Sequence, residues 1–95
     1  MMKLSKKEIQ EKIANLSDWT YNENAIHTKI EFENFKEAFS FMTRVAFEAE
    51  AQAHHPEWTN VYNQVEVSLA THDAGGVTQK DFQLAKTIDQ LLGEE

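Results

Sequence analysis

Two adjacent histidines followed by a proline are the residues of this 95-residue chain best suited to proton chemistry. His54 and His55 stand in the stretch "AEAQAHHPEW", where an apparent helix has to end. Imidazole has an unperturbed pKa of about 6.5, so it can both give and take a proton near neutrality. Glu50 precedes His54 by four residues, a spacing that places two helical side chains on one face. We therefore expect Glu50 to orient His54.

A third histidine can reach the same place. His72 follows an alternating apolar stretch, just before the glycine-containing "DAGG" segment, and we expect it at the end of the last strand. If two hairpins lie side by side in one sheet, the end of this strand comes near the turn that holds His54 and His55. Three imidazoles and a carboxylate would then converge on one cleft. The fourth histidine, His27, lies on the polar side of a strand and is expected at the surface.

Each of these residues also has a purely structural explanation. His54 could be a cation that interacts with the exposed carbonyls of a helix C-terminus. Asp81 completes a capping box in "TQKD", and that role alone would account for it. Trp58 fits the core or the sheet, Glu50 fits a solvated helix surface, and His72 fits an exposed strand end.

Metal binding and nucleophilic catalysis are weaker interpretations. Three histidines and a glutamate could bind zinc or iron. However, adjacent histidines diverge in extended backbone, and the spacing matches neither HExxH nor another compact metal motif. The chain has no cysteine, and no serine lies in an elbow-like setting that would nominate a nucleophile. "AGG" is too common to indicate a phosphate-binding loop. We expect no metal site.

The elements that must position the histidines follow from periodicity and capping signals. Ser5 with Glu8 predicts a capping box and a first helix reaching about residue 16. Asn34 with Glu37 predicts a second helix, which Pro56 ends at about residue 53 because it restricts the preceding backbone. Thr78 opens the last helix. Between the helices, ranges 18–22, 25–32, 58–63 and 64–72 read as two hairpins.

This order, α-β-β-α-β-β-α, predicts an α+β fold. We expect one domain over residues 1–95, with a four-stranded antiparallel sheet and three helices packed on one face. Folding should depend on Phe35, Phe39, Val67 and Ile88 rather than on the histidines. The sheet has two edges, and a small chain can pair one of them with a second copy of itself.

The charge balance narrows the choice of partners. Nine Lys and Arg against sixteen Asp and Glu give a net charge of −7. A nucleic-acid-binding protein would normally show a clustered basic face, so direct binding to DNA or RNA is not expected. The start of the sequence has no apolar run of signal-peptide type, and no window approaches a membrane span. These features, together with the absence of cysteine, favour a cytoplasmic protein.

The candidate residues form a spaced motif: Glu50, His54-His55-Pro56, Tyr62, His72 and Asp81. This motif resembles the signature of the pterin-4a-carbinolamine dehydratases, also called 4a-hydroxytetrahydrobiopterin dehydratases. The resemblance extends into the segments "FKEAFSFMTRVAFEAE" and "HHPEWTNVYNQVEVSLATHDAGGVTQKDFQLAKTID". It covers essentially the whole chain.

The resemblance implies a lyase activity in tetrahydrobiopterin recycling. The family removes water from the 4a-carbinolamine that an aromatic amino acid hydroxylase leaves on its pterin, and forms the quinonoid dihydropterin. It implies no cofactor, because the reaction involves no redox change. By resemblance, His54, His55 and His72 are the catalytic residues, with His55 as the principal acid–base group.

The resemblance also implies roles beyond the histidines. Glu50, Trp58 and Asp81 would bind the substrate or shape its pocket. Family members form homodimers and homotetramers through sheet edges and helices, so we expect one of these assemblies. An animal relative also stabilises the dimer of a transcription factor. A non-catalytic interaction module is therefore the alternative function, and it predicts that His55→Ala changes nothing.

Overall fold

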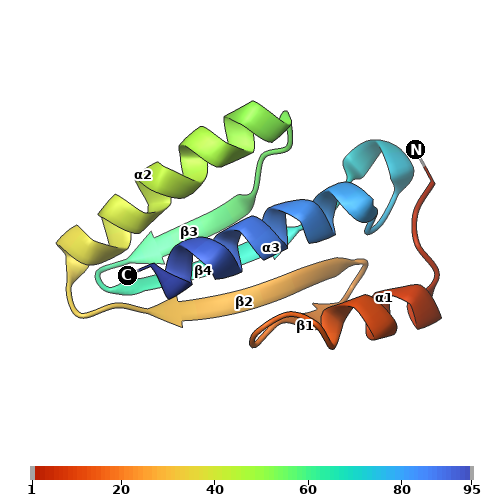
Figure 1. Cartoon of the computed structure of the whole chain (residues 1–95), viewed down its shortest axis with the longest axis horizontal. Helices are drawn as coiled ribbons and strands as arrows, with labels where there is room; N and C mark the ends of the chain where they lie inside the picture. The colour runs from red at the N-terminus through yellow and green to blue at the C-terminus, as the bar shows by residue number, and fades with distance from the viewer. Residues whose placement is uncertain (1, 95) are drawn as a thin grey trace.

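The computed structural model describes residues 2–94 of the chain, and three α-helices, four β-strands and one short 3₁₀ helix occur within them (Figure 1). In chain order these are α1 (Lys6–Ile13), β1 (Thr20–Asn22), β2 (Ala25–Glu31), α2 (Phe35–Gln52), β3 (Glu57–Val61), β4 (Gln64–Leu69), η1 (His72–Ala74) and α3 (Gln79–Gly93).

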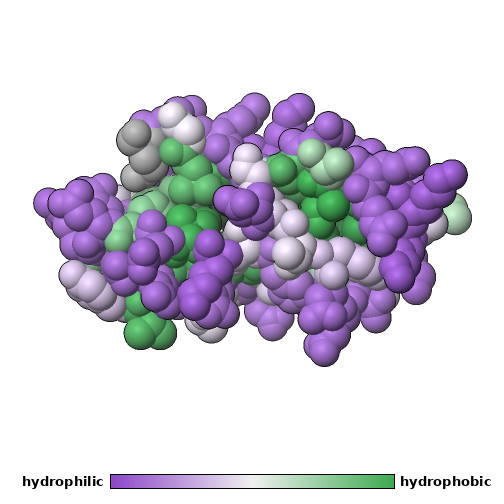
Figure 2. All heavy atoms as spheres, turned by 90° about the horizontal axis from the view of Figure 1, so that it is seen from below, coloured by the Kyte–Doolittle hydropathy of each residue, from purple (hydrophilic) through white to green (hydrophobic). Residues whose placement is uncertain are grey.

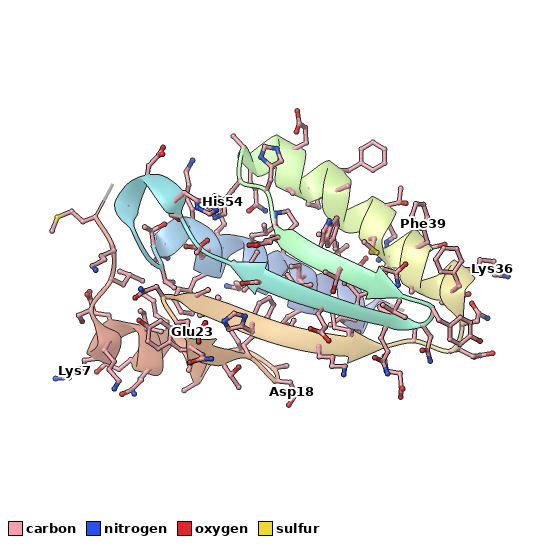
Figure 3. All side chains as sticks on the ribbon, turned by 180° about the vertical axis from the view of Figure 1, so that it is seen from behind. Lys7, Asp18, Glu23, Lys36, Phe39 and His54 are labelled. Carbon is pink, nitrogen blue, oxygen red and sulfur yellow. The ribbon has the colours of Figure 1, made fainter. Side chains whose placement is uncertain are left out.

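The four strands form one antiparallel sheet in the order β1-β2-β4-β3. The two hairpins, β1–β2 and β3–β4, lie side by side because β2 pairs with β4. The helices cover one face of this sheet and leave the other open, as the view from behind shows (Figure 3). The predicted α+β fold, with its order of elements, is therefore confirmed.

All three predicted helix starts are present. Ser5 and Glu8 form a capping box in which each side chain bonds the other residue's backbone N–H. The hydrogen bond from the Ser5 backbone N–H, and then that from its side chain, holds the pKa of Glu8 below its usual range. Asn34 Oδ1 accepts a hydrogen bond from the Glu37 N–H at 2.9 Å and so caps α2.

The core differs from the prediction at α2. The buried residues of this helix are Ala38, Phe41, Val45 and Ala49. Phe35 and Phe39, which were predicted to support folding, are instead exposed by about half, whereas Val67 and Ile88 are buried as predicted. The helix has apolar residues on two faces, and periodicity alone could not decide which face lies against the sheet.

His72 lies in a turn, not at the end of the last strand as expected. β4 ends at Leu69, so His72 lies beyond the strand and begins the η1 turn. Gly75 ends this turn in the left-handed region at a φ of 73°, a conformation that favours glycine. Thr71 and Gly76 pair across its base as an isolated β-bridge. The "DAGG" segment is thus a closed turn with fixed ends.

The surface agrees with the charge balance. Hydrophilic side chains cover most of the side seen in Figure 2, and apolar atoms reach the surface there in separate groups. Among residues 2–94, no helix is both long and apolar enough to cross a membrane.

Candidate active site

A cleft of about 710 Å³ opens where the C-terminal end of α2, the η1 turn and the start of α3 meet. His54, His55 and His72 all line it, so the predicted convergence of three imidazoles is present. We call this space the histidine cleft. Its lining residues are Ala53, His54, His55, Pro56, Glu57, Ala70, Thr71, His72, Asp73 and Lys80.

His54 forms the buried histidine–carboxylate pair of the cleft. Its Nε2 lies 2.5 Å from Asp81 Oδ1. The Asp81 side chain has no exposed surface, and that of His54 is 10 % exposed. An ionised carboxylate can only accept hydrogen bonds, so His54 Nε2 carries the proton that faces Asp81. Nδ1 is then the nitrogen left for chemistry, because it makes no hydrogen bond to any of the residues the structure describes.

His55 forms a second pair in an exposed setting. Its Nε2 lies 2.9 Å from Glu50 Oε1, and the two side chains are 67 % and 81 % exposed. Exposed ion pairs contribute only about 0–1 kcal/mol because water screens them. Thus Glu50 constrains the His55 ring far less than Asp81 constrains His54.

The prediction that Glu50 orients His54 is therefore wrong, because Glu50 pairs with His55 and Asp81 pairs with His54. The cause lies in the backbone between them. Ala53 adopts a left-handed conformation, with φ 54° and ψ 40°, directly after the last helical residue of α2. The rule that residues four apart share a helix face stops at this point, and His54 turns toward α3.

Asp81 caps α3, as one reading of the sequence expected, and it also contacts His54, which was not predicted. Its Oδ2 accepts from the Thr78 backbone N–H at 2.8 Å, which completes the predicted capping box of α3. The same oxygen accepts from the Thr71 hydroxyl at 2.8 Å, and Oδ1 remains for His54. Capping and histidine orientation are thus performed by one buried side chain.

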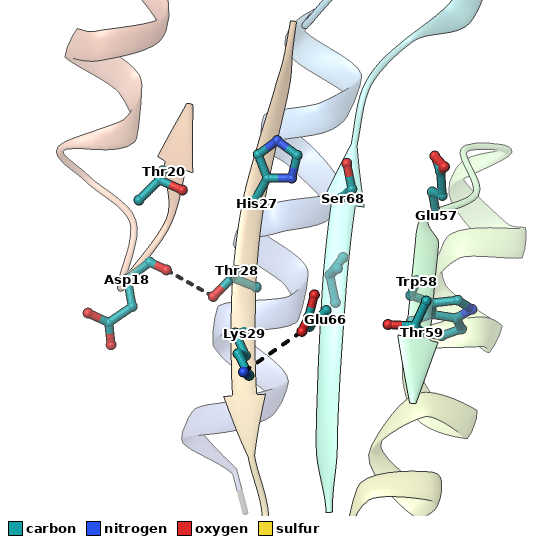
Figure 4. A pocket seen from close by; sticks show the side chains of 11 residues that line it. Asp18, Thr20, His27, Thr28, Lys29, Glu57, Trp58, Thr59, Glu66 and Ser68 are labelled. Carbon is teal, nitrogen blue, oxygen red and sulfur yellow. Dashed lines mark hydrogen bonds and ion pairs between the residues drawn. The ribbon is translucent and has the colours of Figure 1, made fainter. Parts of the chain in front are cut away.

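Trp58 is not brought to the histidine cleft. It is half-buried on β3, packs against the hydrophobic core, and borders a separate depression of about 570 Å³ on the open face of the sheet (Figure 4). Lys29 and Glu66 form an ion pair in this depression, with Nζ 3.8 Å from Oε1. Both side chains are exposed to solvent. A role for Trp58 in binding substrate stays a prediction.

His27, which we expected at the surface, lies closer to the site than its polar strand position indicates. It is half-buried, and its Nε2 lies 2.9 Å from the Asn22 carbonyl oxygen. It lines a cavity of about 350 Å³ that is also bordered by His55 and His72. Figure 4 shows His27, Ser68 and Glu57 following one another across β2, β4 and β3. The cleft therefore continues toward the open face of the sheet.

Three further residues of the site escaped the sequence analysis. Lys80 lines the cleft from the first turn of α3, and Glu57 lines it from the start of β3. Thr71 was assigned only to the alternation of a strand, although its hydroxyl contacts Asp81. The sequence feature that could have indicated Thr71 was its position directly before His72 and ten residues before Asp81.

The donor set offers proton chemistry more readily than metal chemistry. Each of His54 and His55 directs one ring nitrogen at a carboxylate, and the two carboxylates belong to different helices. Within residues 2–94, no three His, Cys, Asp or Glu side chains are grouped so that they could hold a metal ion. Imidazoles oriented by carboxylates, with a second nitrogen free, are the usual apparatus of general acid–base catalysis.

Comparison with known proteins places the chain among proteins with a described activity. A sequence model of the family "Pterin 4 alpha carbinolamine dehydratase" matches residues 2–91. A relative from Christiangramia forsetii, named "Putative pterin-4-alpha-carbinolamine dehydratase", is 60% identical over 97% of this chain and 95% of its own length. A relative of the same name from Chelativorans sp. is 53% identical over 92% of this chain and 91% of its own length.

A solved structure agrees with these sequence matches. The crystal structure of a protein from Brucella melitensis, described as a transcriptional coactivator/pterin dehydratase, superimposes with a TM-score of 0.91. The two sequences are 38% identical, and the match covers 94% of this chain and 97% of the Brucella melitensis chain. On the family match, the identities and the shared fold, this chain belongs to the pterin-4-alpha-carbinolamine dehydratase family.

Proposed function

We propose that this protein dehydrates 4a-hydroxytetrahydrobiopterin, or a closely related pterin-4a-carbinolamine, to the quinonoid dihydropterin and water. The observation that carries the proposal is the meeting of His54, His55 and His72 in one cleft of a member of this family. We place the activity in the recycling of a tetrahydropterin that an aromatic amino acid hydroxylase has used.

The reaction needs two proton movements. The 4a-hydroxyl must gain a proton to leave as water, and ring nitrogen N5 must lose one so that its electron pair forms the new double bond to C4a. No electrons are exchanged with a second molecule, so acid–base groups are sufficient. Positioned acid–base groups typically accelerate such steps by about 10² to 10⁴-fold.

The geometry supports a division of labour among the histidines. His55 is exposed in the cleft and is paired with the similarly exposed Glu50, so its ring is accessible to a bound substrate. We assign it the principal acid–base role. His54 is held firmly by Asp81 and lines the cleft, which suits it to bind or protonate the leaving hydroxyl together with His72.

The test is the dehydration of freshly generated 4a-hydroxytetrahydropterin, followed by the rise of quinonoid dihydropterin absorbance. Wild type should accelerate the reaction and His55→Ala should lose at least about 10²-fold of that acceleration. Gln83→Ala is the control, because Gln83 is exposed on α3 and does not line the histidine cleft. Retention of full activity by His55→Ala would move the principal role to His54 or His72.

A second candidate function is a protein-binding module, as the coactivator description of the Brucella melitensis structure indicates. The helix α2 supports it by exposing Phe35, Phe39 and Phe47, three phenyl rings at intervals of four and eight residues. In this function the phenylalanines, and not the histidines, would determine activity.

We further propose that the protein forms a homodimer or homotetramer. α2 exposes three phenyl rings, of which those of Phe35 and Phe39 pack together with centroids 5.8 Å apart, and exposed apolar groups of this kind mark interaction surfaces. The strands β1 and β3 are the two edges of the sheet and each pairs on one side within the chain. Self-association would cover both features.

A further inference from the structure

The hydroxyl of Thr71 lies between the buried His54–Asp81 pair and the turn that carries His72. Thr71 Oγ1 is 2.8 Å from Asp81 Oδ2 and 2.7 Å from Thr78 Oγ1. Neither contact is part of the capping box, which uses the Thr78 backbone N–H. Thr71 therefore adds a bond to Asp81 that the start of α3 does not need.

The direction of the hydrogen bonds follows from counting protons. A threonine hydroxyl has one proton, and an ionised carboxylate can only accept, so the Thr71 proton points at Asp81 Oδ2. The proton between the two threonines must then come from Thr78. The Thr78 hydroxyl donates to the Thr71 hydroxyl, which donates to Asp81 Oδ2, while the His54 ring donates to Asp81 Oδ1. The two hydroxyl bonds run in one direction and so strengthen one another. Together with the His54 bond they hold the carboxylate by both of its oxygens.

The backbone of the same threonine fixes the turn that begins with His72. The Thr71 N–H donates to the Gly76 carbonyl at 2.8 Å, and the Thr71 carbonyl accepts from the N–H groups of Ala74 and Gly75 at 3.1 Å. This residue is thus the base of the turn, and His72 is its immediate neighbour. A movement of Thr71 would displace His72 relative to α3.

We infer that Thr71 is a positioning residue that holds two of the three histidines in register, His54 through Asp81 and His72 through the turn. The inference rests on the proposed function for its catalytic consequence, but the coupling itself can be observed without substrate. It assigns Thr71 no contact with the reacting atoms. It explains why a polar side chain stands where an alternating strand would place an apolar one.

The test compares Thr71→Val with Thr71→Ser and with Thr28→Val. Valine has the shape of threonine without the hydroxyl, whereas serine retains the hydroxyl. Thr28 is the matched control, because it is also a buried threonine and lies outside the histidine cleft. Its hydroxyl donates a hydrogen bond to the Asp18 carbonyl oxygen at 2.9 Å. The first readout is the NMR signal of the His54 ring N–H that faces Asp81.

We expect Thr71→Val to shift or broaden the His54 ring N–H signal, and Thr71→Ser and Thr28→Val to preserve it. In the dehydration assay, Thr71→Val should lower kcat/KM by about 10 to 10²-fold, since small misplacements of catalytic groups cost this much. Thr71→Ser should recover most of the rate. An unchanged signal together with an unchanged rate in Thr71→Val would overturn the inference.

Failure of the proposed function and failure of the inference about Thr71 give different results. If wild type does not accelerate dehydration while Thr71→Val still alters the His54 signal, the coupling stands and the proposed function fails. If Thr71→Val does not fold, Thr71→Ala gives the same two readouts without placing a methyl group against the buried carboxylate. Failure of both variants to fold would contradict the inference, because the hydroxyl would then serve folding itself.

Discussion

At the scale of single residues, the site contains two histidine–carboxylate pairs with opposite surroundings. His54 and Asp81 are buried together, whereas His55 and Glu50 are exposed. Removing one partner of a buried pair typically costs about 3–5 kcal/mol, and an exposed pair contributes about 0–1 kcal/mol. The two carboxylates should therefore differ greatly in importance.

This difference gives the first prediction. Asp81→Asn should lower kcat/KM for dehydration by about 10² to 10⁴-fold, because the amide can no longer hold the His54 ring in one tautomer. Glu50→Gln should lower it by less than about 10-fold, since solvent already competes for the exposed pair. Thermal melting of both variants checks that they are folded. Similar losses in the two variants would contradict the assignment.

At the scale of elements, the end of α2 decides which carboxylate each histidine meets. The sequence correctly predicted where this helix ends, from Pro56, and that the histidines lie at its end. It could not predict the left-handed backbone at Ala53, because alanine has no preference for that region. The pairing of Glu50 with His55 instead of His54 follows from this one residue.

Ala53→Gly tests the backbone at that point. Glycine adopts a left-handed conformation without steric cost, so this substitution should raise the free energy of unfolding by about 1 kcal/mol. Ala51→Gly is the matched control, since Ala51 is exposed within the helical part of α2. It should lower the free energy of unfolding by about 0.5–1 kcal/mol. Urea denaturation measures both, and destabilisation by Ala53→Gly would show that the cap is not strained.

The two apolar faces of α2 give a prediction about the core. Phe41 is fully buried against the sheet and its ring lies 5.1 Å from that of Phe32, so Phe41→Ala should cost about 3–5 kcal/mol. Phe39 is 55% exposed, and Phe39→Ala should cost less than about 1 kcal/mol. Chemical denaturation at a dilution where self-association does not contribute to stability compares them. A larger cost at Phe39 would restore the face that the sequence favoured.

Other parts of the fold were predictable because local signals agreed with one another. Each of the three helix starts carries a capping side chain, and both hairpins alternate inward and outward residues. The network of Thr71 was not predictable in the same way. It depends on how α3 docks beside the η1 turn, which brings residues 71 and 81 together through tertiary packing.

At the scale of the whole molecule, the distribution of exposed apolar side chains predicts self-association. Phe39→Glu and Phe47→Glu should each convert the assembly to smaller species, because a buried carboxylate in an apolar contact is costly. Light scattering coupled to size-exclusion chromatography measures the mass. Gln83→Glu, on the exposed side of α3, should leave it unchanged. A wild type that is monomeric at all concentrations would contradict this prediction.

The two proposed functions, catalysis and protein binding, depend on different side chains. Catalysis would use the histidine cleft, and protein binding would use the exposed phenylalanines of α2. Variants of the cleft should therefore retain the assembly. Replacement of His54 should lower the free energy of unfolding, because Asp81 would stay buried without its partner. Rates of the variants are therefore compared at equal concentrations of folded protein.

The most direct measurement is the rate of dehydration of 4a-hydroxytetrahydropterin with wild type and with the variant His54→Ala/His55→Ala/His72→Ala, at equal concentrations of folded protein. We predict that wild type accelerates the formation of the quinonoid dihydropterin and that the triple variant leaves the uncatalysed rate unchanged. Equal acceleration by both proteins, or none by wild type, would contradict the proposal that the histidine cleft is the catalytic site.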